Sequence, residues 1–385
     1  MSSTLDLLPY ATTEAQRAHV QAVAEHGSAA AAAPATGISR GTLTKTISVL
    51  RKRAALVGHG EHNPHVPDGF RVKGVSRLID SDGATKQEWI KTERDKPSPE
   101  DVAEAMDRAF ADWDGPLAHP VPAPAVTEDD KLTVYPMGDP HVGCLAWAPE
   151  TGADYDLEIA EHLLTDTARQ LVDFAPPSTR ALVLNLGDFF HADDPSNRTP
   201  TGGNQLDVDG RQAKIIDAGL RIMGTVIELA LTKHEVVTLV NVRGNHDPSS
   251  SLWLSRAMRE RYRNDPRVEV DTSPAWMGHM VFGENLLAWT HGHGAKLPTL
   301  PGKMAAAWPK QWGDTTYRKC HVGHFHHKDT KEHDGATVET YNTLAARDAW
   351  HAMKGYQADR YAVCEVYHRG KRGPQRIHRV NVETP

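Results

Sequence analysis

Residues 181–191 read ALVLNLGDFFH, in which an apolar run ends at Gly187 and is followed by Asp188 and His191. A short apolar run that stops at a glycine is typical of a buried strand followed by a tight loop. Glycine also lets the backbone approach a ligand closely. Because functional groups in α/β sheets gather beyond the carboxyl ends of strands, this stretch predicts both a buried strand and a site at its end.

The same arrangement recurs along the second part of the chain. The five runs are KLTVYPMGDPH (131–141), ALVLNLGDFFH (181–191), VVTLVNVRGNHD (236–247), LLAWTHGHG (286–294) and CHVGHFHH (320–327). Between them, residues 157–174 and 213–231 show the apolar spacing of helices. Strands that alternate with helices predict an α/β fold.

Length and composition set outer bounds. The 385 residues predict two or three domains, and the net charge of −7 excludes a uniformly basic nucleic-acid coat but not a local patch. Three widely spaced cysteines exclude a disulfide framework and a cysteine zinc site. No apolar run approaches the roughly 18 residues that cross a bilayer, and the first residues do not resemble a signal peptide. We therefore expect a cytoplasmic protein without a membrane partner.

The N-terminal part predicts helices over residues 14–58, with a break at 34–37 and Ser39 as an N-cap. Two helices, a glycine-containing turn and a basic second helix over residues 40–57 resemble a helix-turn-helix DNA reader. The alternative is a helical oligomerisation module with a solvated basic face. The basic side chains that we expect to contact DNA are Arg40, Lys45, Arg51, Lys52 and Arg53.

A linker is predicted before the α/β part. Residues 69–92 predict a β-hairpin around an Asp-Gly turn, and residues 100–113 predict one more helix. Residues 115–126 contain four prolines, which favours a semi-rigid spacer. The predicted organisation is a DNA-binding domain with a β-hairpin (1–114), a proline-rich linker (115–130) and an α/β domain (131–385).

Each polar motif is a weak signal alone, since a lone Asp-x-His is usually a turn or core feature. Their joint occurrence in this order is specific. Asp139-Pro-His141, Gly187-Asp188, Gly244-Asn245-His246-Asp247, His291-Gly-His293 and Gly323-His324-Phe-His326 match the five signature blocks of calcineurin-like metallophosphoesterases. The resemblance covers about residues 131–345 and implies an α/β/β/α sandwich, here with a small, mainly helical N-terminal domain.

The second block narrows the resemblance. Residues 187–191, GDFFH, look like the corresponding stretch of the Mre11 and SbcD nucleases, and no Asp-Arg-Gly of the phosphoprotein phosphatases comes after them. The whole arrangement resembles proteins carried by bacteriophages and prophages that are labelled DNA repair exonuclease or metallophosphoesterase. The cytoplasm of a bacterial host is then the expected location.

The resemblance also implies a two-metal site. Mixed oxygen and nitrogen ligands favour manganese, with iron, zinc or nickel as alternatives. His246 would be the general acid, Asp247 would stabilise its imidazolium, and His191 would contact the phosphate, orient DNA or serve a structural role. The implied ligands are Asp139, His141, Asp188 and His326 for the first ion, and Asp188, Asn245, His291 and His324 for the second.

The resulting interpretation is a two-metal DNA phosphodiesterase, a nuclease that attacks the phosphate with an activated water. The alternatives are a small-molecule or cyclic-nucleotide phosphodiesterase or phosphatase, and a non-catalytic DNA-binding regulatory module. The intact ligand set argues against the last. DNA is the expected partner, and a homo-oligomer stays open. Because the chain ends at Pro385, soon after the last block, we do not expect a partner of the SMC-like ATPase type.

Overall fold

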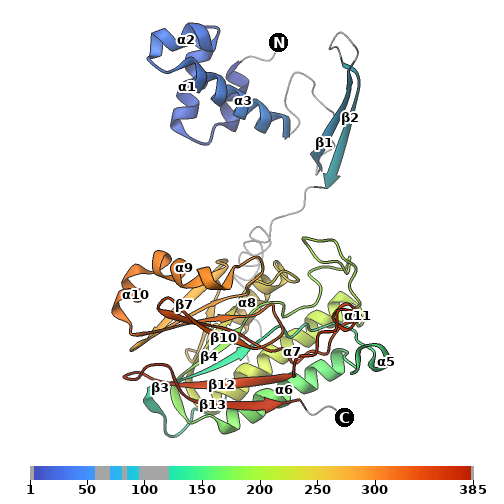
Figure 1. Ribbon diagram of the computed structural model, residues 1–385, viewed down its shortest axis with the longest axis vertical. Helices are drawn as coiled ribbons and strands as arrows, with labels where there is room; N and C mark the ends of the chain where they lie inside the picture. Colours follow the sequence, from blue (N-terminus) through green and yellow to red (C-terminus); the bar gives the residue numbers. More distant parts are fainter. Residues whose placement is uncertain (1–3, 57–69, 80–84, 95–120, 383–385) are drawn as a thin grey trace. The chain divides into compact units, whose positions relative to one another are not determined.

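The computed structural model describes residues 4–56, 70–79, 85–94 and 121–382 (Figure 1). The chain divides into two compact units, Met1–Pro97 and Ser98–Pro385. The helix expected over residues 100–113 lies outside the described residues, and so do residues 115–120 of the expected linker. The domain boundaries at 114 and 131 therefore stay predictions, although strand β3 begins at Glu128, inside the expected linker.

The described part of the first unit contains four helices and a two-stranded hairpin. Its elements are η1 (Thr4–Tyr10), α1 (Glu14–Glu25), α2 (Ala29–Thr36), α3 (Arg40–Leu56), β1 (Phe70–Ile79) and β2 (Thr85–Arg94). The Ser39 hydroxyl accepts a hydrogen bond from the Thr42 amide, as expected of an N-cap. Strands β1 and β2 pair antiparallel, which confirms the hairpin, while its turn lies outside the described residues.

The helices of this unit share a small core. Val20 of α1, Ala32 of α2, and Leu43 and Leu50 of α3 are fully buried together. The break expected at residues 34–37 is wrong in its first part, because α2 continues through Pro34 to Thr36. Pro34 has no amide hydrogen, so close to the helix end it costs α2 one backbone hydrogen bond. The helix ends at Gly37, whose φ of 70° is easily adopted by glycine.

The second unit has two sheets and several helices. The helices are α5 (Ala148–Thr151), α6 (Leu157–Phe174), α7 (Gln212–Leu231), α8 (Ser250–Arg261), η2 (Leu297–Thr299), α9 (Leu300–Ala307), α10 (Pro309–Asp314) and α11 (Ala349–Met353). The first sheet has the order β13-β12-β3-β4-β5-β6 and the second β10-β11-β9-β8-β7. The strands are β3 (Glu128–Met137), β4 (Ser178–Asn185), β5 (His234–Asn241), β6 (Val268–Asp271), β7 (Met277–Phe282), β8 (Asn285–Thr290), β9 (Tyr317–Val322), β10 (Asp329–His333), β11 (Ala336–Thr340), β12 (Tyr361–His368) and β13 (Pro374–Asn381).

The layers form an α/β/β/α sandwich, as predicted. Helices α6, α7 and α8 pack on the six-stranded sheet, and α9 packs on the five-stranded sheet (Figure 1). Both faces of strand β8 are buried, because each packs against a different layer. Leu286 and Ala288 pack toward α9, whereas Leu287 and Trp289 pack between the sheets. Within the described part of the chain, no helix is long and apolar enough to span a membrane.

The strand register places the functional loops together. Strands β3, β4 and β5 are parallel, and their last residues Met137, Asn185 and Asn241 are in register. Strands β8 and β9 are also parallel and end level at Thr290 and Val322. Because all five motifs follow the carboxyl ends of these strands, the two sheets direct their loops to one common edge.

A buried charged group lies between the sheets, on the side of β9 that faces the six-stranded sheet. We call it the Lys319 cluster; its members are Lys319, His321, Glu339, Tyr341, Glu365 and Tyr367. The Lys319 ammonium lies 2.7 Å from carboxylate oxygens of both Glu339 and Glu365. Burial acts to raise the pKa of Glu365, but the Lys319 charge and the His321 ring hold that pKa well below its usual value.

Candidate metal centre

The loops at the common edge carry an unusual backbone conformation. Among the residues that the structure describes, six that are not glycine have a positive φ. Such angles are uncommon outside glycine, and they persist where the surrounding structure enforces them, frequently at functional sites. Five of the six are predicted metal ligands: Asp139 (46°), His141 (47°), Asp188 (49°), His324 (71°) and His326 (55°).

Hydrogen bonds between the loops hold these conformations. The His141 amide donates to the Asp188 carbonyl at 3.0 Å, and the His246 amide donates to Asp188 Oδ1 at 2.7 Å. The His324 amide lies 2.9 Å from both carboxylate oxygens of Asp139. At Gly244 an added Cβ would come within 2.1 Å of Asp188 Oδ1, so only glycine fits.

The first group of ligand atoms comes from the loops after β3 and β9. It contains Asp139, His141 and His326, whose ligand atoms all lie within 4.8 Å of one another. His141 Nε2 is 3.1 Å from His326 Nε2, and the latter is 3.6 Å from Asp139 Oδ1. These are three of the four residues expected to hold the first ion.

The second group comes from the loops after β4, β8 and β9. Asp188, His291 and His324 again offer ligand atoms within 4.8 Å of one another. His291 Nε2 lies 3.2 Å from Asp188 Oδ2 and 2.9 Å from Asn245 Oδ1, which brings the expected amide ligand to the same place. We call the two groups together the Asp/His cluster; its members are Asp139, His141, Asp188, Asn245, His291, His324 and His326.

The donor set fits divalent cations. His291 Nδ1 donates to the Leu186 carbonyl at 2.9 Å, so in the neutral ring Nε2 carries a lone pair. That lone pair faces the oxygens of Asp188 and Asn245, which are acceptors themselves. A cation between these atoms relieves the conflict, and imidazole with carboxylate suits manganese, iron, zinc or nickel.

The electrostatics agree with a centre that attracts positive charge. Burial opposes protonation of His291, yet Asp188 and Asp139 raise its pKa to about 10. Burial and the His291 charge instead lower the pKa of His324 to about 4. The ring nearest the carboxylates takes up a proton in the position where a cation is expected. His324 stays neutral, which is the form that binds a metal.

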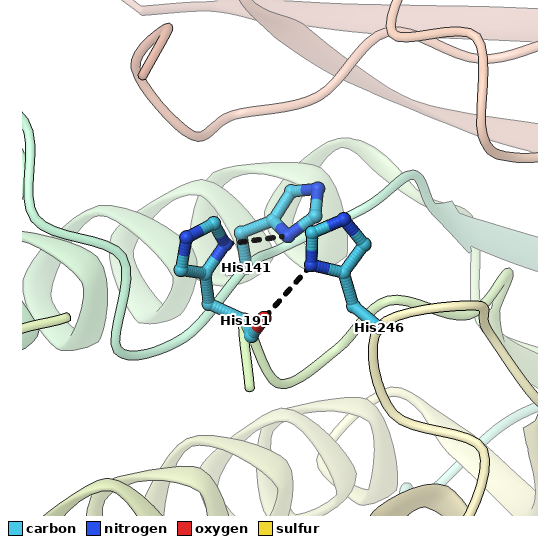
Figure 2. A group of neighbouring side chains, drawn as sticks. All are labelled: His141, His191 and His246. Carbon is cyan, nitrogen blue, oxygen red and sulfur yellow. Dashed lines mark hydrogen bonds between the residues drawn. The ribbon is translucent and has the colours of Figure 1, made fainter. Parts of the chain in front are cut away.

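A third group consists of histidines alone: His141, His191 and His246 (Figure 2). Figure 2 shows the three rings gathered together, with His191 Nδ1 3.2 Å from His141 Nδ1. His246 Nδ1 donates to the His191 carbonyl at 2.8 Å. Its Nε2 is therefore the atom that is free to exchange a proton. His191 is only 2% exposed, so its position favours the structural alternative, in which it fixes the His141 ring.

The expected role of Asp247 is corrected by its contacts. We predicted that its carboxylate would stabilise the His246 imidazolium. Instead, Oδ1 accepts from the amides of Gly244 and Asp188, and Oδ2 accepts from the Phe190 amide. Asp247 thus ties the loop after β5 to the loop after β4, and it positions Asp188 rather than assisting His246. The physical reason is that buried backbone amides need acceptors, and the fully buried Asp247 carboxylate supplies them.

Sequence analysis missed two neighbours of the cluster. His351 of α11 stacks on His326, with ring centroids 4.9 Å apart and an interplanar angle of 18°. Asp348, the N-cap of α11, accepts from His351 Nδ1 at 2.7 Å. Burial acts against its ionisation, but His351 lowers the pKa of Asp348 to about 2. No apolar run precedes this Asp-x-x-His, so the pattern that revealed the other motifs does not mark it.

The cluster opens into a wide cleft of about 1200 Å³. Asp188, His246 and His326 form part of its wall, together with residues of α11 and the loop after it. Trp308 and Trp312, which precede the last motif in the sequence, do not line the cleft and instead pack against the core beneath α9.

The basic residues of the first unit divide into two kinds. Arg40, Lys45 and Arg51 are exposed on α3, as the DNA-binding prediction requires. Arg53 is different, because its guanidinium donates to the Tyr10 carbonyl, Thr12 Oγ1 and Gln16 Oε1. Arg53 thus ties α3 to the start of α1, and its role as a DNA contact stays a prediction. The Lys52 side chain lies outside what the structure describes.

Comparison with known proteins gives structural likenesses only. No protein-family model matches the chain, and no curated protein matches it. A predicted phosphoesterase from Streptococcus pneumoniae TIGR4 is 11% identical, with 66% of this chain and 98% of that one covered and a TM-score of 0.26. Vps29 from Chaetomium thermophilum is 12% identical, with 66% of this chain and 100% of that one covered and a TM-score of 0.28. A 5'-nucleotidase from Candida albicans SC5314 is 10% identical, with 69% of this chain and 54% of that one covered and a TM-score of 0.32. Scores this low identify neither substrate nor activity.

Proposed function

We propose that the chain is a two-metal phosphodiesterase whose substrate is DNA. The observation that carries the proposal is the Asp/His cluster, in which two groups of ligand atoms from five strand-end loops meet at the wall of one open cleft. Asp139, His141, Asp188 and His326 would hold the first ion. Asp188, Asn245, His291 and His324 would hold the second, with the Asp188 carboxylate shared.

The chain's own groups supply the remaining steps. When bound, two divalent ions activate a water molecule and stabilise charge on the phosphate. His246 is held through Nδ1 by the His191 carbonyl and lines the cleft, so its Nε2 is placed to protonate the leaving oxygen. Asp247 keeps the loops of Asp188 and Asn245 together through backbone amides. His191 keeps the His141 ring in place.

Three features favour DNA over a small substrate. The cleft of about 1200 Å³ is larger than the roughly 300–1,000 Å³ of ordinary small-molecule pockets. The GDFFH stretch resembles that of DNA nucleases. The first unit carries exposed cations on α3, Arg40, Lys45 and Arg51, which suit a phosphate backbone. We include this unit in the proposal as the DNA-binding part of the protein.

The test is hydrolysis by the purified full chain with added Mn²⁺. The substrates are linear and circular DNA, each single- and double-stranded, beside bis-p-nitrophenyl phosphate and cyclic nucleotides. We expect DNA cleavage that EDTA abolishes, with Asp188→Asn, purified identically, as the inactive control. Hydrolysis of only the small esters would replace the proposal with a small-molecule phosphodiesterase. DNA binding without hydrolysis of any substrate would replace it with a regulatory DNA-binding module.

A further inference from the structure

Two aromatic side chains stand on the wall of the cleft without a role in the proposed chemistry. Trp350 of α11 and Tyr356, just after this helix, are each 51% exposed and line the cleft. Their ring centroids lie 6.0 Å apart, and the ring planes differ by only 28°. Single exposed apolar residues are ordinary, but two nearly parallel rings beside a charged centre form a surface suited to a flat ligand.

A chain of ring contacts fixes this surface relative to the Asp/His cluster. His326, a proposed ligand of the first ion, stacks on His351 at 4.9 Å. His351 in turn meets the Trp350 ring edge to face at 4.9 Å and the Tyr356 ring at 5.6 Å. Because Asp348 holds His351 through both its backbone amide and Nδ1, the position of the aromatic rings is coupled to the metal centre.

Arginines add positive charge around the rings. Arg347 donates to the carbonyls of Tyr356, at 2.6 Å, and Thr151, at 2.8 Å, which fixes the loop after α11. Arg360 donates to the Leu344 carbonyl. Both residues line the cleft, and their carbonyl partners do not cancel their charge. The aspartates of the same wall, Asp348 and Asp359, are bound to His351 and Arg379. A ligand for this wall therefore has a flat aromatic part and a negatively charged part.

We propose that Trp350 and Tyr356 form a nucleobase platform, which stacks on a base of the strand whose phosphate lies at the Asp/His cluster. This inference rests on the proposed function and makes it more specific. A paired base inside a duplex has no free face, so the platform selects single-stranded DNA or a frayed end. Stacking of a base on an aromatic side chain is typically worth about 1–3 kcal/mol and tolerates every sequence.

The experiment compares a four-nucleotide oligothymidylate with a strand of equal length whose nucleotides are abasic. KM is measured with Mn²⁺, and affinity is measured by anisotropy of the fluorescein-labelled strands in EDTA. We expect Trp350→Ala to weaken both measures for the thymidylate about tenfold and to leave the abasic strand unchanged. Trp350→Phe should restore most of the loss. Met353→Ala is the matched control, because Met353 is 71% exposed on the same helix and is not among the cleft-lining residues.

The two proposals fail in different ways. The platform proposal is wrong if Trp350→Ala weakens binding of both strands equally or of neither. It is also wrong if Trp350→Phe is as defective as Trp350→Ala. In each case hydrolysis by the wild-type protein persists. Trp350-dependent preference for the strand with bases, combined with no hydrolysis by the wild-type protein, would support the platform and contradict the proposed phosphodiesterase activity.

Discussion

The Lys319 cluster and the Asp/His cluster are both buried and both rich in charge, but their hydrogen bonds differ. In the Lys319 cluster, Glu365 Oε1 accepts from Lys319 Nζ and the Tyr341 hydroxyl. Its Oε2 accepts from the Tyr367 hydroxyl and lies 3.3 Å from His321 Nε2. Glu365 thus has a fixed cation and two hydroxyl donors from the chain itself, and in this sense the cluster is complete.

In the Asp/His cluster, imidazoles take the place that Lys319 has in the other cluster. His291 Nε2 lies 3.2 Å from Asp188 Oδ2, and His326 Nε2 lies 3.6 Å from Asp139 Oδ1 and 3.1 Å from His141 Nε2. An imidazole compensates a carboxylate only while it holds a proton, and a divalent cation can take the place of that proton between these atoms. The comparison teaches that burial and charge alone do not mark a functional site. The difference is the compensating cation, which is a fixed lysine in one cluster and an exchangeable proton, whose place a metal ion can take, in the other.

The largest expected effect comes from Asp188, the carboxylate that we propose to bind both ions. Asp188→Asn should abolish phosphodiester hydrolysis and remove most bound metal, since a neutral amide replaces the bridging ligand. An amide oxygen can still accept from the His246 amide, so the fold should persist. Elemental analysis, activity and circular dichroism check this. A single ion per chain in fully active wild-type protein would contradict the two-metal assignment.

The next effect separates metal binding from proton transfer. His246→Ala should retain both ions but lose roughly a hundred- to ten-thousand-fold in turnover on DNA, the usual contribution of a general acid. The loss should be smaller for bis-p-nitrophenyl phosphate, because p-nitrophenolate leaves without protonation. If the two substrates suffer equally, His246 positions the substrate rather than protonating it.

A substitution in the Lys319 cluster should lower the stability of the protein and leave its activity unchanged. Lys319→Met leaves Glu365 buried without its cation, while Glu339 keeps its ion pair with Lys328, and this should cost about 3–5 kcal/mol in the free energy of unfolding. Urea denaturation measures this, and the turnover per folded molecule should be unchanged. Adding Glu365→Gln to the same chain should recover part of the loss. Activity that falls in proportion to stability would break the distinction between the two clusters.

Glu365 of the Lys319 cluster should also contribute to the pH dependence of stability. The folded-state pKa of Glu365 lies below its unfolded value, so its stabilisation is present above about pH 4.3 and is lost as the pH falls through the folded pKa. In EDTA, the stability of the wild type should fall below pH 4.3 with a contribution of about 1.4 kcal/mol per pH unit from this one proton. Glu365→Gln should lack that contribution, whereas Glu332→Gln, at an exposed position of β10, should keep it.

The smallest expected effects concern two arginines of α3, one exposed and one hydrogen-bonded within the first unit. Arg51 is exposed, whereas Arg53 is bound to Tyr10, Thr12 and Gln16. Arg51→Gln should change the slope of log K against log salt for duplex DNA by about 0.9 without affecting stability. Arg53→Gln should leave the slope unchanged and lower the stability of the first unit by about 1 kcal/mol. Binding titrations at several salt concentrations check both, and an equal effect of the two variants on the slope would support Arg53 as a DNA contact.

Much of the site was predictable from the sequence because its information is local. An apolar run, a glycine and a ligand-type side chain fix where a strand ends and which groups its loop presents, and parallel strands bring such ends to one edge. For this reason Asp139, Asp188 and His291 meet where expected, although their use as ligands stays a proposal. The helices of residues 157–174 and 213–231 were also predictable, since a 3.6-residue apolar period needs no distant partner.

Other roles were decided only by tertiary contacts. Asp247 stands next to His246 in sequence, yet two of its three amide donors, Asp188 and Phe190, lie 59 and 57 residues away. Arg53 belongs to a basic run in the sequence, but its partners lie 37–43 residues earlier in the chain. Trp350 and His351 follow no strand motif and reach the cleft through the packing of α11. The sequence determines which groups each strand end presents, because that depends on neighbours along the chain. Only the folded structure decides which donors and charges meet them, because a buried polar group takes its partners from whatever the sheets bring within hydrogen-bond reach.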